Sequence, residues 1–259
     1  MLESSATMPR IGECAYCWNE TELTTEHATA RWVPGKIPDS ESIAPVRGRH
    51  MFAGELTIDD VCGRCNNGRL GQLDQYAESW WDRNVHEHVT ELDADEVKLG
   101  KWLAKGAFNM QRIEKRERQD AARPPIPDDA IRWIIGEGRL HDSLGIVVAG
   151  LPGGHYSAAN AGHDSAPMQV MPLRWTHLRG LVFMIVWQAK NWDVPVAGMV
   201  RMICDSMPGV ALDLLGGGNG PRTLPIIAKP DFVEKGLYDN HALRIAMTEH
   251  WRKERDRTS

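Results

Sequence analysis

The segments Cys14-Ala-Tyr-Cys17 and Cys62-Gly-Arg-Cys65-Asn66-Asn67 decide how this chain folds. Each C-x-x-C pair presents two sulfurs from one tight turn, and two such pairs supply the four thiolates of a tetrahedral zinc site. The dipeptide Glu26-His27 lies between the two pairs, and Asn66 directly follows the last cysteine. We therefore expect Cys14, Cys17, Cys62 and Cys65 to bind a structural zinc ion that brings these polar residues together.

The composition is that of a soluble globular protein. The chain has 259 residues, of which 42% are hydrophobic and 25% are charged. Its longest apolar run, 181–187, is too short to span a bilayer, and residues 1–10 lack the pattern of a secretory signal. We expect a cytoplasmic protein without a membrane partner, where paired cysteines bind metal more often than they form disulfides. A disulfide or a redox thiol pair is the alternative, and Cys204 is expected to be a small buried hydrophobic residue.

The charge distribution argues against tight, non-specific binding to nucleic acid. The formal net charge is −5, and acidic residues outnumber basic ones within residues 1–90. Binding to a phosphate backbone is driven by counterion release to lysine and arginine, and an acidic module gains little from this effect. A local basic strip near the cysteine pairs is the exception, and Arg31, Arg64 and Arg69 are its candidate contacts to nucleic acid.

Hydrophobic periodicity and turn signals predict an α+β protein in three parts. These are a zinc-stabilised module at 8–92, a linking helix within 93–120, and a strand-rich α+β domain of unknown role at 121–259. Asn66 or Asn67 is expected to cap a helix that continues to about residue 80. The other expected helices are 95–119 and 241–253, and the expected strands are 51–61, 145–148, 168–171, 178–187, 196–203 and 224–228.

His27, Glu26 and Asn66 are the residue types required for metal-assisted hydrolysis of a phosphodiester. A neutral imidazole accepts a proton from water, and a carboxylate and an amide oxygen hold a divalent cation. Oxygen ligands suit Mg²⁺ or Mn²⁺, whereas the four thiolates suit Zn²⁺. If one zinc ion binds both cysteine pairs, the strand with His27 and the helix with Asn66 are held side by side.

The pattern of these residues resembles the HNH endonucleases of the ββα-metal fold, in particular the bacterial and phage branch with a CxxC…EH…CxxCNN signature. The resemblance covers about residues 14–77. It implies an N-terminal zinc-bound ββα module in which His27 is the general base and Glu26 and Asn66 bind a catalytic Mg²⁺ or Mn²⁺ ion. It also implies DNA as the substrate, with RNA as the alternative, a homodimer as one form of assembly, and a phage, mobile-element or defence context.

The chain departs from this family at three positions of its pattern. Ala30 stands in place of a proline, Arg69 in place of a lysine, and Thr57 in place of the middle asparagine. That asparagine orients the catalytic histidine in the family, so Thr57 is the departure closest to the chemistry. The alternative function is therefore a catalytically weakened zinc-binding module that recognises nucleic acid or a protein partner without cutting.

Overall fold

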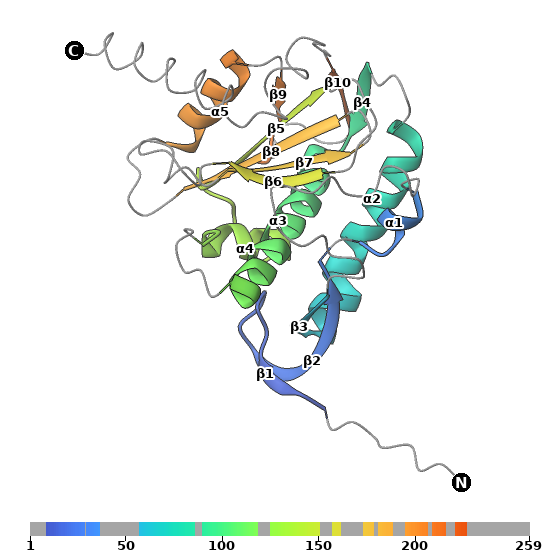
Figure 1. The fold of residues 1–259 in the computed structure, drawn as a ribbon, viewed down its shortest axis with the longest axis vertical. Coiled ribbons are helices and arrows are strands. Elements are labelled where there is room, and N and C mark those ends of the chain that lie inside the picture. The colour runs from blue at the N-terminus through green and yellow to red at the C-terminus, as the bar shows by residue number, and fades with distance from the viewer. Residues whose placement is uncertain are drawn as a thin grey trace, which may run out of the picture.

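The computed structural model of this chain contains both helices and antiparallel sheets, which confirms the mixed α+β composition (Figure 1). It describes residues 9–28, 30–36, 57–85, 90–118, 125–150, 157–161, 173–178, 181–188, 195–206, 209–215 and 221–226. The expected strand at 168–171, the expected helix at 241–253 and the whole segment 37–56 lie outside the described residues. Within the described residues, no helix combines the length and the apolar character needed to cross a bilayer.

In the part of the chain that the structure describes, the strands form a three-stranded sheet in the order β1-β2-β3, a pair β10-β4 and a five-stranded sheet in the order β6-β7-β8-β5-β9. The strands are β1 Ile11–Glu13, β2 Glu20–His27, β3 Thr57–Cys62, β4 Glu91–Ala94, β5 Leu144–Gly150, β6 Ser157–Ala161, β7 Leu173–Leu178, β8 Leu181–Trp187, β9 Gly209–Ala211 and β10 Arg222–Pro225. The helices are α1 Trp32–Lys36, the π-helical turn η2 Arg64–Leu70, α2 Gly71–Asn84, α3 Glu96–Arg118, α4 Asp128–Ile134 and α5 Val196–Ser206.

Helix α3 is the central element of the described fold. Its 23 residues nearly coincide with the helix predicted for 95–119. It packs against α2, α4, β3 and β8, and so connects the small N-terminal sheet with the five-stranded sheet (Figure 1). One hydrophobic core runs from Cys14 to Ile226 across these elements. The expected domain boundaries at 92 and 120 stay a prediction.

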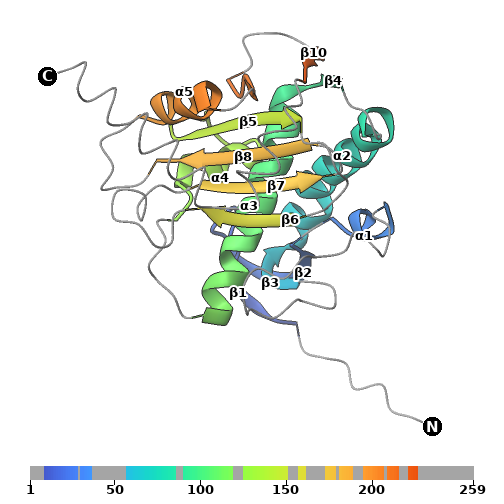
Figure 2. The same cartoon turned by 45° about the horizontal axis from the view of Figure 1, so that its top comes forward.

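Both faces of the five-stranded sheet are covered at its centre. Every residue of β8 is buried, as is typical of a strand with packing on both sides. A Cβ atom added at Gly145 would lie 2.4 Å from a methyl group of Val200 on α5, so glycine permits this close approach. The next residue, Ile146, points to the opposite face, where α3 lies. Figure 2 shows α5 lying along β5 and α3 crossing the sheet.

The prediction of a strand at 196–203 is wrong, because this segment forms helix α5. Its β-branched and apolar residues favour a strand locally, but Val196, Met199 and Ile203 are buried at helical spacing. They cover the face of the sheet that α3 leaves open. Cys204 therefore lies on a helix, where it is half-buried, and not at the end of a strand.

The prediction that Asn66 or Asn67 caps the helix after the second cysteine pair is also wrong. The helix begins earlier, with the π-helical turn η2, and its first flanking residue is Gly63, which makes no side-chain cap. Helix α2 then continues to Asn84. The wider turn keeps Cys65 beside Cys62 and directs the side chain of Asn66 towards β2, where it forms hydrogen bonds with the strand.

Candidate metal centre and active site

The four cysteines predicted to bind zinc form one cluster. Their sulfur atoms all lie within 4.8 Å of one another, and the sulfurs of Cys17 and Cys62 are 3.8 Å apart. Four sulfurs bound to one tetrahedral zinc ion at about 2.3 Å would lie about 3.8 Å from each other. All five cysteines of the chain are free thiols. The cluster is therefore able to hold a metal ion such as zinc, and the disulfide alternative has no support.

Backbone amides already point at these sulfurs. The N–H group of Cys62 donates to Cys14 Sγ at 3.3 Å, and that of Cys65 donates to Cys62 Sγ at 3.4 Å. Burial raises the pKa of the Cys14 thiol, but N–H groups of Cys62, Cys17 and Tyr16 outweigh this effect and lower the pKa to about 7. Burial and the neighbouring sulfurs raise the pKa of Cys65. A bound cation would compensate the repulsion between these thiolates.

Strand β2 places His27 opposite Thr57. Thr24 pairs with Val61, and after a register shift Glu26 pairs with Ile58 and His27 with Thr57. The shift adds one residue to β3, as a β-bulge does. Without it, regular pairing would place His27 opposite Ile58. The bulge thus brings together the predicted base and the residue at the position of the family's middle asparagine.

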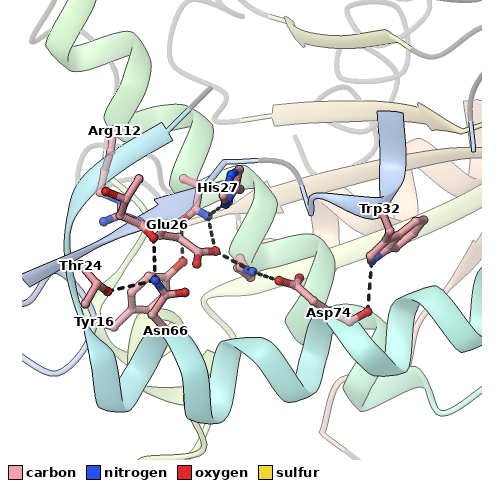
Figure 3. Close-up of polar contacts among 11 residues, drawn as sticks. Tyr16, Thr24, Glu26, His27, Trp32, Asn66, Asp74 and Arg112 are labelled. Carbon is pink, nitrogen blue, oxygen red and sulfur yellow. Dashed lines mark hydrogen bonds and ion pairs between the residues drawn. The ribbon is translucent and has the colours of Figure 1, made fainter. Parts of the chain in front are cut away.

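Asn66 is held against the same strand. Its amide nitrogen donates to Thr24 Oγ1 at 3.0 Å and to the carbonyl oxygen of Thr25 at 2.8 Å (Figure 3). These two bonds use both amide hydrogens and fix the side chain in one orientation. The carbonyl oxygen Oδ1 is consequently the atom of Asn66 that remains suited to bind a cation. The structure therefore places Asn66 in contact with Thr25, the residue that precedes the Glu26-His27 dipeptide on β2.

Glu26 lies in a different environment from its neighbour. Only 4% of Glu26 is exposed, whereas His27 is half-buried. Its Oε1 atom lies 2.7 Å from the ammonium nitrogen of Lys105, which lies 2.7 Å from Asp74 Oδ2 as well. Figure 3 shows the Glu26 and Asp74 carboxylates directed towards one another. The carboxylate predicted to bind a catalytic metal thus already has a buried cation beside it. Its role as a metal ligand stays a prediction.

Helix α3 supplies the rest of a buried polar network around this dipeptide. Asn109 is fully buried, and its amide nitrogen donates to the carbonyl oxygen of His27 at 3.2 Å. Tyr16, in the first cysteine turn, donates its hydroxyl to Asn109 Oδ1 at 2.6 Å. Burial raises the pKa of Tyr16, so this hydroxyl remains a donor. Arg112 also donates to Asn109 and forms an ion pair with Asp60.

Sequence reasoning did not identify Lys105, Asn109 or Asp74. One signal was available, because Lys105 and Asn109 lie four residues apart among buried apolar residues of α3. Polar residues at that spacing share one face of a helix, and a buried lysine requires a negatively charged partner. Which carboxylates would meet it depends on the packing of α2 and β2, which the sequence does not reveal.

The three candidate arginines occupy different environments. Arg31 is exposed at the turn before α1. Arg69 lies 2.5 Å from Glu137 Oε1, and Arg64 lies 3.8 Å from the same oxygen. Two of the three predicted contacts to nucleic acid thus face one carboxylate after α4. Its negative charge weakens the electrostatic attraction of these arginines for a phosphate group.

Comparison of this chain with protein-family models, with curated proteins and with solved structures finds no match. The function proposed below therefore rests on the residues and contacts described above.

Proposed function

We propose that this protein is a zinc-stabilised endonuclease of the HNH type that hydrolyses DNA phosphodiester bonds with a divalent metal ion. The arrangement of Asn66, Thr57 and His27 around β2 carries the proposal. Asn66 forms two hydrogen bonds with the residues that precede Glu26-His27, and Thr57 lies directly opposite His27. The cysteine cluster explains why these segments lie together, because it joins the turn before β2 to the end of β3 and the start of η2.

In this proposal His27 is the general base. Its backbone is fixed by pairing with Thr57 and by Asn109, while its half-buried ring accepts a proton from the attacking water. The orientation of Asn66 suits its Oδ1 atom to hold Mg²⁺ or Mn²⁺, and the bound ion would stabilise negative charge on the phosphate. Arg31, Arg64 and Arg69 would contact the DNA backbone.

A zinc-stabilised module that binds nucleic acid or a protein without cutting is the second candidate function. The ion pair between Glu26 and Lys105 favours it, since a neutralised carboxylate attracts a divalent ion less strongly.

Two assays on the zinc-loaded full chain separate the candidates. DNA binding is measured by fluorescence anisotropy, and cleavage of supercoiled plasmid is measured over a titration of MgCl₂ or MnCl₂. Metal-dependent nicking supports the nuclease, whereas binding without nicking at any metal concentration supports the second candidate. RNA in place of plasmid tests the alternative substrate.

Thr57→Asn is expected to raise the cleavage rate about tenfold, a fraction of the usual contribution of general base catalysis. The longer amide side chain would reach the imidazole of His27 across the strand pair and fix its orientation. Initial rates of plasmid nicking at saturating Mn²⁺ measure the effect. Thr57→Val, which has the same shape without a hydrogen-bonding group, is the matched control. Equal rates for the Asn and Val variants would contradict an orienting role for this position.

Glu137→Gln is expected to strengthen DNA binding, because it removes the negative charge beside Arg64 and Arg69. Each arginine that gains a phosphate contact should steepen the dependence of log K on log salt by about 0.9. Anisotropy titrations over a series of NaCl concentrations measure this slope. Glu91→Gln removes an exposed charge from β4, away from these arginines in the sequence, and should leave the slope unchanged. An unchanged slope for Glu137→Gln would remove Arg64 and Arg69 from the proposed DNA-binding surface.

A further inference from the structure

A lysine ammonium group occupies the space between two carboxylates that come from separate elements. Lys105 on α3 lies 2.7 Å from Glu26 on β2 and 2.7 Å from Asp74 on α2. The side chains of Lys105 and Glu26 are only 3% and 5% exposed, and that of Asp74 is 26% exposed. Two carboxylate oxygens directed at one buried positive centre resemble the ligand arrangement of a cation site. In this protein the positive charge belongs to a lysine side chain and not to a metal ion.

We propose that the ammonium group of Lys105 takes the place of a metal ion between Glu26 and Asp74, so that Glu26 is a positioning residue for His27. The proposal rests on the proposed function in taking His27 as the reactive residue and Asn66 as the side on which Mn²⁺ binds. A divalent ion at this point would have to displace Nζ, because both carboxylates already contact it at hydrogen-bond distance. A buried ammonium group without these partners would be strongly unfavourable, so the two carboxylates and the lysine stabilise one another as a set.

Asn109 connects this ion pair to His27. It lies four residues after Lys105, on the same face of α3, and its amide nitrogen donates to the carbonyl oxygen of His27. The same nitrogen lies 3.5 Å from Glu26 Oε1, at the outer limit of a hydrogen bond. Helix α3 thus holds the side chain of Glu26 through Lys105 and the backbone of His27 through Asn109. In this arrangement Glu26 fixes the end of β2, and the metal ion of the proposed reaction binds on the side of Asn66.

The experiment measures the melting temperature of the zinc-loaded full chain with and without MnCl₂, in the wild type and in Lys105→Met. Removal of the ammonium group leaves two buried carboxylates facing each other, which is expected to lower the melting temperature by roughly 10 °C. Mn²⁺ should then raise the melting temperature of Lys105→Met well above the change seen in the wild type, because the ion fills the position of the lost charge. Lys98→Met removes an exposed lysine of the same helix and should show neither effect.

If Lys105→Met fails to fold, the variant Glu26→Gln provides a second test of the proposal. Mn²⁺ binding to this variant, measured by electron paramagnetic resonance, is expected to stay within about twofold of the wild type, whereas loss of a charged ligand would weaken it about tenfold or more. Such a loss in Glu26→Gln, or a Lys105→Met variant with unchanged stability and no added Mn²⁺ response, would overturn the proposal. Neither readout uses DNA cleavage, so absence of nuclease activity would refute the proposed function and leave this result intact.

Discussion

Cys65→Ser is expected to abolish zinc binding and to unfold the segment from β1 to α2. The buried sulfur of Cys65 lies within 4.8 Å of the other three, so its loss removes one of four ligands from a closed site. Structural zinc sites contribute about 10 kcal/mol or more of apparent binding free energy, which is comparable to the whole stability of a typical domain. Zinc content by mass spectrometry should fall from about one ion per chain to nearly none. Hydrogen exchange should become fast across β1, β2, β3, η2 and α2.

Cys204→Ser is the matched control, because Cys204 lies on α5, outside the cluster. It should retain full zinc content and normal exchange in β2, β3 and α2. A strong chelator should reproduce the effect of Cys65→Ser on the wild type, and added ZnCl₂ should reverse it. A Cys65→Ser protein that keeps protected amides in β2 and β3 would show that the hydrophobic core holds this segment without metal.

His27→Ala is expected to lower metal-dependent DNA cleavage about 100-fold or more, which is the usual contribution of a general base. Folding should be retained, because the backbone of residue 27 keeps its pairing with Thr57 and its hydrogen bond from Asn109. Zinc content and DNA affinity should therefore match those of the wild type. His141→Ala removes an exposed histidine from the segment after α4 and should leave the cleavage rate unchanged.

The spacing of the cysteines was sufficient to predict the metal cluster, because two C-x-x-C turns have few other uses in a chain of this composition. Helix α3 was predicted nearly to its ends, since its apolar residues recur at helical spacing over 23 residues. The sequence favours a strand over the residues of helix α5, because Val196 to Ile203 is apolar except for Arg201 and the sheet face that the helix covers is known only from the fold. In this segment the packing of the helix against the sheet outweighs the local preference for a strand.

The sequence indicates Glu26, His27 and Asn66 as members of the candidate site, but not Lys105, Asn109 or Asp74, and not the contacts between them. The order of Glu26-His27 and Cys65-Asn66 in the sequence indicated that these residues meet. The bulge that sets His27 against Thr57 depends on the pairing of two strands that are distant in the sequence. The burial of Glu26 beside Lys105 depends on how α3 packs against β2. Such long-range contacts have no local signal in the sequence, and for this reason α3 was expected only to link two parts of the chain.

The most direct measurement of the proposed nuclease activity is nicking of supercoiled plasmid by the zinc-loaded full chain, run beside His27→Ala purified in the same way. The proposal predicts nicking by the wild type that requires added Mg²⁺ or Mn²⁺ and nearly disappears in His27→Ala, while zinc content and DNA affinity stay equal. Equal nicking by both proteins, or none by the wild type with zinc bound and DNA affinity intact, would contradict His27 as the general base of an endonuclease.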